Sequence, residues 1–584
     1  MENVKSDEEE EKSVSYDNIF NKAGDFGLYQ ILILTAIASF AVFASANNFS
    51  SSLTLADVPH VCKYPKNISH SIHELSSHDE KLLIIPKNSK GKFENCAIFD
   101  RPYSTMTSDE AHLLLSNKTL LENETASTIP CPNGYNYDTS EASETAVTEW
   151  NLVCGKKWQT DLASVVYQAG GFFGLLVIGF LGDLIGRRRT SLIALVFLIV
   201  VTILSGVARN YLFYLITRFV TGMFNLPVAS ILLILCLEIT GPNWRIVVVV
   251  ASHIVWVLGY FFLTLLAYKL NNWKVIHIVT GSVLILFLSF YFFIPESPRW
   301  LFSKRKIKEC LEVLNKMAKA NDRKFLKSAN SEELKILDPQ QQLLSTSDNF
   351  ESEASTGQWQ QQQEEQHIKT GTVEVKTYTP IDLFRFPVLR KRVIILCFQW
   401  FAVSFIYYSF VYGSSKFHGN IFINFMIEGA AEMPGVILSL VMMGLLGRNN
   451  VLSILFISCG VSIIISKFVA KWPKLIFILI SKMMISGCFT TTYLYTNELL
   501  PTVLRCTGFC FISAVGRIAA IIVPFVGKIG GYASPVTSWT SAIIAGVMMP
   551  WLPETKGHYL PQKVSDIDRI PEDDDKEENI TNTP

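Results

Sequence analysis

Charged residues are scarce in this sequence and carry no net charge. Only 17% of its 584 residues are Asp, Glu, Lys or Arg, the 51 basic residues balance the 51 acidic ones, and 49% are hydrophobic. Balanced charge provides no electrostatic footprint for a nucleic acid, so we do not expect a nucleic acid partner. The apolar residues recur in runs of about 20, the length needed to cross a bilayer, which is not typical of a soluble domain.

The sequence also lacks the side-chain groupings expected of an enzyme or a metalloprotein. It has no nucleophile–base pair, phosphate-binding glycine loop or metal-ligand spacing, and His253 has no ligand partners nearby in the sequence. We therefore predict no catalytic residue, no metal and no cofactor. Residues 1–25 are polar and acidic, unlike a signal peptide, and the first apolar run is long enough to remain as a membrane span.

Twelve apolar runs predict an all-α membrane protein with twelve transmembrane helices in two six-helix bundles. The middle of the linker between the bundles, 340–366, is rich in Gln, Ser and Glu and is predicted to be disordered. The predicted segments are an N-terminus (1–26), span 1 (27–47), a polar domain (48–157), spans 2–6 (158–294), a linker (295–392), spans 7–12 (393–552) and a C-terminal tail (553–584).

The polar domain between spans 1 and 2 has the marks of an extracellular compartment. It combines cysteines with Asn-x-Ser/Thr sequons in a stretch with few core residues, which indicates disulfide bonding and glycosylation. A further sequon, at Asn48, lies too near the first span to be expected to carry a glycan. The cysteines are Cys62, Cys96, Cys131 and Cys154, whose pairing the sequence leaves open, and the sequons begin at Asn67, Asn117 and Asn123.

Basic residues predict the orientation of the spans. Three clusters, Arg187–Arg189, Lys304–Lys308 and Arg390–Arg392, fall on the same side of the predicted spans as both termini. Three lysines between residues 467 and 474 fall on the other side and disagree. The majority places both termini and the linker in the cytoplasm.

The stretch Gly179–Arg189 predicts a tight turn between spans 2 and 3. Its glycines allow two helices to approach closely, Asp183 suits a helix terminus, and three consecutive arginines resist crossing a bilayer. Such a turn either fixes the topology alone or belongs to a gate. Its spacing, Gly-x3-Asp-x2-Gly-x-Arg-Arg, resembles the loop between spans 2 and 3 of the major facilitator superfamily, although Leu184 replaces the usual basic residue.

Further motifs resemble the organic cation, anion and zwitterion (carnitine) transporters of that superfamily. They include Glu149–Cys154, Pro295–Trp300 and Asn497–Thr502, and the resemblance covers nearly the whole chain. It implies alternating-access transport of a small organic ion across the plasma membrane, with the lipid bilayer as a partner and a coupling ion left open. Two departures are the four cysteines where this family usually has six, and Gly444–Asn450, the second-half counterpart of the basic turn, which has lost its Asp and one basic residue.

Ionisable side chains inside a span are costly unless paired, so each is a candidate functional residue. The resemblance implies that cation transporters carry Asp at the position of Arg517, whereas anion and carnitine transporters carry Arg. A guanidinium suits a substrate carboxylate; the alternative is a structural arginine paired with Glu432 or a backbone carbonyl. Glu432 is also a candidate for a substrate ammonium, and Lys482 is either a second cation of the site or reaches the outer interface. Val436 stands where anion transporters carry Lys, which favours a zwitterion or a monoanion.

Aromatic residues complete the predicted substrate site. The resemblance places Tyr407, Tyr408 and Trp256 around the cavity, where aromatic faces stabilise ammonium groups; simple helix packing is the alternative for such a stripe. Trp400 begins the same aromatic stretch, and Tyr260 and Asn47 are further candidates.

A second group of charges repeats in the two halves as an acidic residue, a short loop and an arginine. With the basic turn, it is interpreted as a cytoplasmic charge lattice that stabilises the outward-open state, with loop capping as the alternative. Its members are Asp183, Arg187, Arg188, Arg218, Glu238, Arg245, Glu498 and Arg505.

The resemblance and these residues predict a secondary transporter of a carnitine-like zwitterion or organic monoanion. An organic cation transporter is the alternative. A surface receptor that has lost transport is the second alternative, because the second-half turn is eroded.

Overall fold

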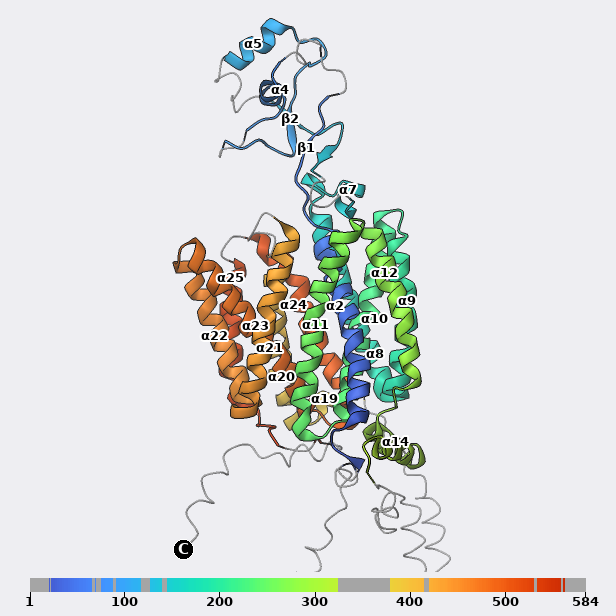
Figure 1. Cartoon of the computed structure of the whole chain (residues 1–584). Helices are drawn as coiled ribbons and strands as arrows, with labels where there is room; N and C mark the ends of the chain where they lie inside the picture. Colours follow the sequence, from blue (N-terminus) through green and yellow to red (C-terminus); the bar gives the residue numbers. More distant parts are fainter. Residues whose placement is uncertain are drawn as a thin grey trace, which may run out of the picture.

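Long helices form most of the chain in the computed structural model, which confirms the expected helical membrane architecture (Figure 1). The structure describes residues 20, 23–65, 69, 75–87, 91–116, 127–138, 144–323, 379–413, 420–529, 533–557 and 560–561. The first-half helices are α2 (Leu28–Thr54), α8 (Trp158–Ile185), α9 (Arg187–Gly206), α10 (Tyr211–Glu238), α11 (Arg245–Leu270) and α12 (Trp273–Phe287). The second-half helices are α20 (Pro387–Val411), α21 (Ile421–Leu446), α22 (Arg448–Phe468), α23 (Lys471–Leu499), α24 (Arg505–Ile529) and α25 (Ala533–Met548).

Within the described residues, 11 helices are long and apolar enough to cross a membrane. The expected twelfth span is the shorter helix α25, of 16 residues, which continues into a 3-10 turn at Met549–Trp551. Span 1 was expected to end at residue 47, but α2 continues to Thr54. Its last two turns are buried between neighbouring helices, so Asn48 is part of the helix bundle and not of a loop.

The cysteine domain (residues 55–157) sits on one end of the bundles. Its strands form two antiparallel pairs, β1 (His60–Cys62) with β4 (Tyr135–Tyr137) and β2 (Ala97–Phe99) with β3 (Thr128–Pro130). Disulfides join Cys62 to Cys131 and Cys96 to Cys154, while the other seven cysteines are free. Short helices complete it: α4 (Ser77–Ile84), α5 (Ser108–Ser116) and α7 (Ala146–Trp150). The sequons at Asn67, Asn117 and Asn123 lie outside the described residues, as does the linker stretch 340–366.

We call the end of the bundles that carries this domain the domain end, and the opposite end the linker end. At the linker end lie the short helices α13 (Pro298–Ser303), α14 (Ile307–Ala320) and α19 (Asp382–Arg385) (Figure 1). The helix α14 packs against Phe20 and Ala23, so the N-terminal segment and the linker cover the same end of the first half.

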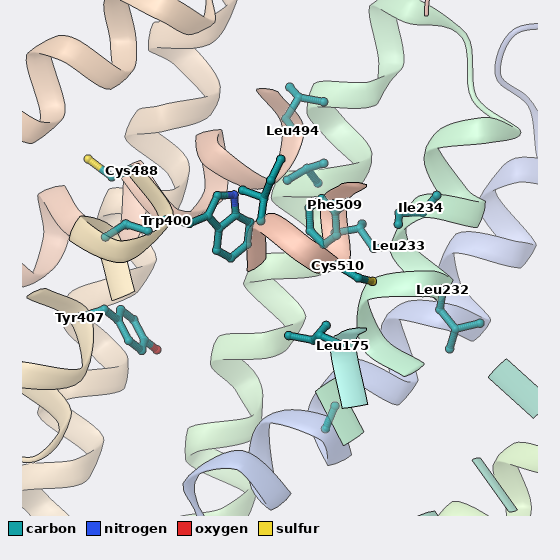
Figure 2. Packing of buried hydrophobic residues seen from close by; sticks show 14 of the residues in the cluster. Leu175, Leu232, Leu233, Ile234, Trp400, Tyr407, Cys488, Leu494, Phe509 and Cys510 are labelled. Carbon is teal, nitrogen blue, oxygen red and sulfur yellow. The ribbon is translucent and has the colours of Figure 1, made fainter. Parts of the chain in front are cut away.

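One apolar core runs through both halves. Figure 2 shows Leu175 of α8, Cys510 and Phe509 of α24 and Trp400 of α20 within a single cluster. A close approach between the halves is permitted by Gly179, because a Cβ there would lie 2.3 Å from Cys510 Cβ. At this point α8 packs against the Cys510 side chain of α24 without a side chain of its own.

Candidate functional site

A cavity lies between the two halves. Its walls come from α2, α10 and α11 of the first half and from α20, α21, α23 and α24 of the second. Most of its surface is apolar, with a small number of polar groups, as is usual for sites that bind small molecules. Its polar and aromatic lining comprises Phe40, Asn48, Phe49, Ser230, Ser252, His253, Trp256, Tyr407, Tyr408, Glu432, Ser486, Phe489, Tyr493 and Arg517.

Arg517 provides a positive pole for this cavity. Its Nη1 donates to Tyr408 Oη at 2.8 Å and to Gln168 Oε1 at 3.5 Å, and the residue is 3% exposed. Within the described part of the chain no carboxylate lies within ion-pair distance of Arg517. A buried cation with only neutral partners is costly in a membrane, and an anionic ligand would relieve this cost.

A second, charge-compensated pole lies around Glu432. Lys482 Nζ lies 2.8 Å from Glu432 Oε1 and 3.8 Å from the ring centroid of Tyr407. Tyr260 Oη donates to Glu432 Oε1 at 2.9 Å and shares a hydrogen bond of 2.7 Å with Tyr407 Oη. The Glu432 carboxylate thus lines the cavity, and its negative charge is compensated by Lys482 and by the hydrogen bond from Tyr260.

Glycines bring these side chains together. A Cβ on Gly435 would lie 1.9 Å from the Met483 carbonyl oxygen, so α21 and α23 touch by their backbones beside Glu432 and Lys482. A Cβ on Gly429 would lie 2.9 Å from Tyr260 Cβ, and one on Gly516 would lie 2.6 Å from Ser404 Oγ. Any larger residue would separate helices that carry the two poles.

Five of the predicted substrate residues line the cavity: Trp256, Tyr407, Tyr408, Glu432 and Arg517.

The other four are not among its lining residues and contact other groups. Lys482 and Tyr260 lie behind the wall and bind Glu432, so Lys482 neither adds a free cation nor reaches the interface, being 1% exposed. Trp400 donates to Thr496 Oγ1 at 2.9 Å and packs on Tyr493. Asn47 uses its carbonyl oxygen to accept from Arg218.

Several lining residues were missed by the sequence interpretation. The ring centroids of Phe49 and Tyr260 lie 4.3 Å apart, and Asn48 Oδ1 accepts from Tyr408 Oη at 3.4 Å. Phe49 and Asn48 both follow the predicted end of span 1. His253 lies 5.1 Å from the ring of Tyr493. His253 precedes Trp256 by three residues, a spacing that places both side chains on one helix face and could have indicated His253 from the sequence.

The first-half basic turn forms a buried charge network at the linker end. Arg187 binds Glu238 through Nε and Nη2, both at 3.1 Å, and lies 3.0 Å from Asp183 Oδ1. Three contacts cross to the other half. Arg505 Nη1 lies 3.0 Å from Glu238 Oε1, Thr507 N–H donates to Asp183 Oδ2 at 2.7 Å, and Arg187 Nη2 donates to the Thr502 carbonyl oxygen at 3.2 Å. This network therefore joins the two halves at the linker end.

A carboxylate that the sequence interpretation overlooked caps this turn. Glu296 accepts from the backbone N–H groups of Arg187 at 2.8 Å and Arg188 at 3.2 Å. Burial raises the pKa of the Glu296 carboxyl above its usual range, against the lowering effect of these hydrogen bonds. Arg188 itself donates from Nη2 to the Tyr291 carbonyl oxygen at 2.8 Å, within the first half.

The second half repeats the arrangement. Arg448 binds Glu498 through Nε at 3.1 Å and Nη2 at 3.2 Å, and Glu554 accepts from the N–H groups of Arg448 and Asn449. Thr555 Oγ1 donates to Glu498 at 2.6 Å.

Arg218 does not belong to this lattice, contrary to the sequence interpretation. It lies about two turns from the domain end of α10, where its guanidinium stacks 4.4 Å from the ring of Tyr167 and donates to Ser51 Oγ at 3.0 Å. It therefore ties α10 to α8 and α2. Arg245 begins α11 at the linker end and is 1% exposed.

Among the described residues, metal-type ligands gather only at His60, Cys96 and Cys154. The two sulfurs are joined in a disulfide, so no thiolate is available there.

A model of the Major Facilitator Superfamily matches residues 157–524. Solute carrier family 22 member 13 from Homo sapiens is 30% identical over 562 residues, covering 95% of this chain and 93% of that protein. The Beta-alanine transporter of Drosophila melanogaster is 28% identical over 576 residues, covering 96% and 90%. The organic cation transporter protein of the same species is 28% identical over 559 residues, covering 95% and 94%.

Among solved structures, the proton:xylose symporter XylE bound to 6-bromo-6-deoxy-D-glucose has a TM-score of 0.55 at 14% identity, covering 91% of this chain and 98% of that chain. At this identity the likeness concerns the fold alone.

Proposed function

Because the chain belongs to the Major Facilitator Superfamily, and within it to solute carrier family 22, we propose that it is a secondary transporter that moves a small organic ion across the plasma membrane by alternating access. In this proposal the cysteine domain is extracellular and the linker end is cytoplasmic. The basic residues Arg187–Arg189 and Arg390–Arg392 at the linker end support this orientation.

The proposed substrate is a small zwitterion with one carboxylate and one ammonium group. The observation that carries this proposal is Arg517, a buried cation in the cavity wall with no acidic partner within ion-pair distance among the described residues. Its guanidinium would receive the carboxylate. The ammonium would face Glu432 and the rings of Tyr407 and Trp256.

Carnitine and β-alanine both have this chemistry. One relative is a β-alanine transporter by name, which supports the zwitterion class, while another is an organic cation transporter by name and keeps that alternative. A simple cation would leave Arg517 without an anion and add a second positive charge to the cavity, so the electrostatics favour the zwitterion.

The transport cycle requires the linker end to open after the substrate binds. In this structure the linker end is bridged by the buried contacts of Glu238 with Arg505 and of Asp183 with Thr507. Toward the domain end the halves are joined by the largely exposed pair of Lys528 and Asp161, 2.7 Å apart, and by long hydrogen bonds from Tyr408 to Asn48 (3.4 Å) and from Arg517 to Gln168 (3.5 Å). Exposed ion pairs and long hydrogen bonds contribute less than short buried ones, so we assign this structure to a state that is closed more firmly toward the cytoplasm.

Uptake into proteoliposomes tests the proposed function. Carnitine, β-alanine and tetraethylammonium would be compared for the wild-type protein, Arg517→Lys and Arg517→Asp. A charge-assisted hydrogen bond is worth about 1.5–3 kcal/mol, so losing it should weaken carboxylate binding about tenfold to a hundredfold. Arg517→Lys should fail partly, because a point charge replaces a planar fork.

The matched control is Arg209→Gln, which removes an exposed arginine at the domain end and should leave uptake unchanged. Wild-type preference for tetraethylammonium that Arg517→Asp leaves unaltered would assign the protein to the cation transporters. Absence of uptake of all three compounds by protein that unfolds normally on heating would favour the receptor alternative.

A further inference from the structure

A second carboxylate lies one helical turn before Glu432 and has no obvious partner. Glu428 of α21 is 2% exposed, and neither of its carboxylate oxygens makes a hydrogen bond to any described residue. Lys482 and Glu432 are close enough to act on it electrostatically, as is Tyr260. Two buried acids therefore share one ammonium group.

The Lys482 ammonium group pairs with Glu432 and not with Glu428. Lys482 lies 2.8 Å from Glu432 Oε1, and the Tyr260 hydroxyl donates to the same oxygen. An ionised Glu428 would be an additional negative charge in a membrane span, with its usual hydrogen bonds missing, and this is strongly unfavourable. A proton on Glu428 removes the charge and leaves the Lys482–Glu432 pair intact.

We propose that Glu428 is a proton site whose occupancy alternates with that of the substrate cation at Glu432, so that the protein exchanges substrate for protons. When an ammonium group binds Glu432, Lys482 is displaced toward Glu428. The O–H bond of Glu428 then breaks, its electron pair stays on the carboxylate to bind Lys482, and the proton passes to water on the open side. This inference rests on the proposed function for the ammonium, but the proton site itself does not.

Lys482 also argues against a sodium ion at this place. Its ammonium already occupies the position beside the carboxylates that a metal cation would take, and a second cation there would be repelled. Lys482 on α23, Glu432 on α21 and Tyr260 on α11 act electrostatically on Glu428. Other titratable groups on the surrounding helices include His253 on α11, Cys459 on α22 and Tyr407 on α20.

Infrared spectroscopy of the full chain in lipid tests the proton site without any substrate. The wild-type protein should show the C=O stretch of a protonated carboxylic acid that disappears as the pH is raised. Glu428→Gln should remove this band. Glu432→Gln should also remove it, because the freed Lys482 would ionise Glu428. Asp183→Asn is the matched control and should keep the band, since Asp183 is paired with Arg187.

An acid band that survives in Glu428→Gln would overturn the proton site, and a band lost only in Glu432→Gln would assign the proton to Glu432 instead.

Coupling is tested by adding carnitine or β-alanine to weakly buffered protein with a pH-sensitive dye. Wild-type protein should release protons on binding, and acid inside the vesicles should drive uptake; Glu428→Gln should lose both effects. Uptake driven by a sodium gradient, or uptake without proton release, would overturn the coupling. If neither compound binds, the proposed function fails, while the infrared band still decides whether Glu428 holds a proton.

Discussion

The two halves of the molecule build their linker ends from the same parts. In the first half Arg187 holds Glu238, and Glu296 accepts from the N–H of Arg187 at 2.8 Å. In the second half Arg448 holds Glu498, and Glu554 accepts from the N–H of Arg448 at 3.0 Å. The second-half turn has Gly444 where the first-half turn has Asp183. Arg448 nevertheless binds a glutamate and has its backbone N–H capped by a carboxylate, as Arg187 does.

The halves differ in which residues pack against the turns at Asp183 and Gly444. Helix α24 of the second half lies against the first-half turn, so Asp183 is buried and accepts from Thr507. At the corresponding point of the second half, Gly444 is exposed and a Cβ there would meet nothing within 4 Å. We therefore expect the first-half turn to hold the two halves together at the linker end. The described hydrogen bonds of Arg448 in the second-half turn stay within the second half.

The largest test of this difference is the pair Glu238→Gln and Glu498→Gln. Removing one partner of a buried ion pair costs about 3–5 kcal/mol. Glu238 binds arginines of both halves, whereas Glu498 binds Arg448 and Thr555 of its own half. We expect the larger loss for Glu238→Gln, measured by thermal unfolding of the protein in lipid. Equal losses in the two variants would contradict an asymmetric seal.

Each turn has a glycine next to the carboxylate that caps it, so we expect Gly186→Ala and Gly447→Ala to lower stability by equal amounts. The two glycines have φ of +108° and +85°, and a Cβ on either would lie 2.4 or 2.3 Å from the capping carboxylate. Strained backbone of this kind costs about 1–3 kcal/mol, and unfolding should report similar losses for both. Gly527→Ala, in an open helical position, is the control and should not destabilise. A clearly unequal pair would mean that the caps are not equivalent.

The sequence predicted the helical fold and the residues whose chemistry is unusual for a membrane, such as Arg517. It could not predict which charges pair, because Lys482 reaches Glu432 only where Gly435 lets two helices touch. Arg218 was grouped with the wrong charges for a similar reason, since its depth along α10 and its contact with Tyr167 depend on tertiary packing. Glu428 belongs to no sequence motif, and it is recognised in the structure only because its buried carboxylate oxygens make no hydrogen bond to a described residue.

A kinetic test of the asymmetry is Asp183→Asn. The variant keeps the size of the side chain but loses the charge that accepts from Thr507 and faces Arg187. A weaker seal between the halves should slow turnover about tenfold, which corresponds to about 1.4 kcal/mol. Apparent affinity for carnitine should stay nearly the same, because Asp183 lies at the linker end, away from the cavity. A large loss of equilibrium binding by correctly folded protein would contradict this role.

The smallest expected effect comes from restoring the lost acid with Gly444→Asp. The new carboxylate would precede Arg448 by four residues, as Asp183 precedes Arg187, and the site has room for it. Because the position is exposed, an ion pair there should change the free energy of unfolding by less than about 1 kcal/mol. Turnover should also stay close to wild type, because a Cβ at Gly444 would meet no described atom of the other half within 4 Å. If turnover slowed as much as in Asp183→Asn, the second-half turn would also contact the opposite half during the cycle. The two turns would then have the same role.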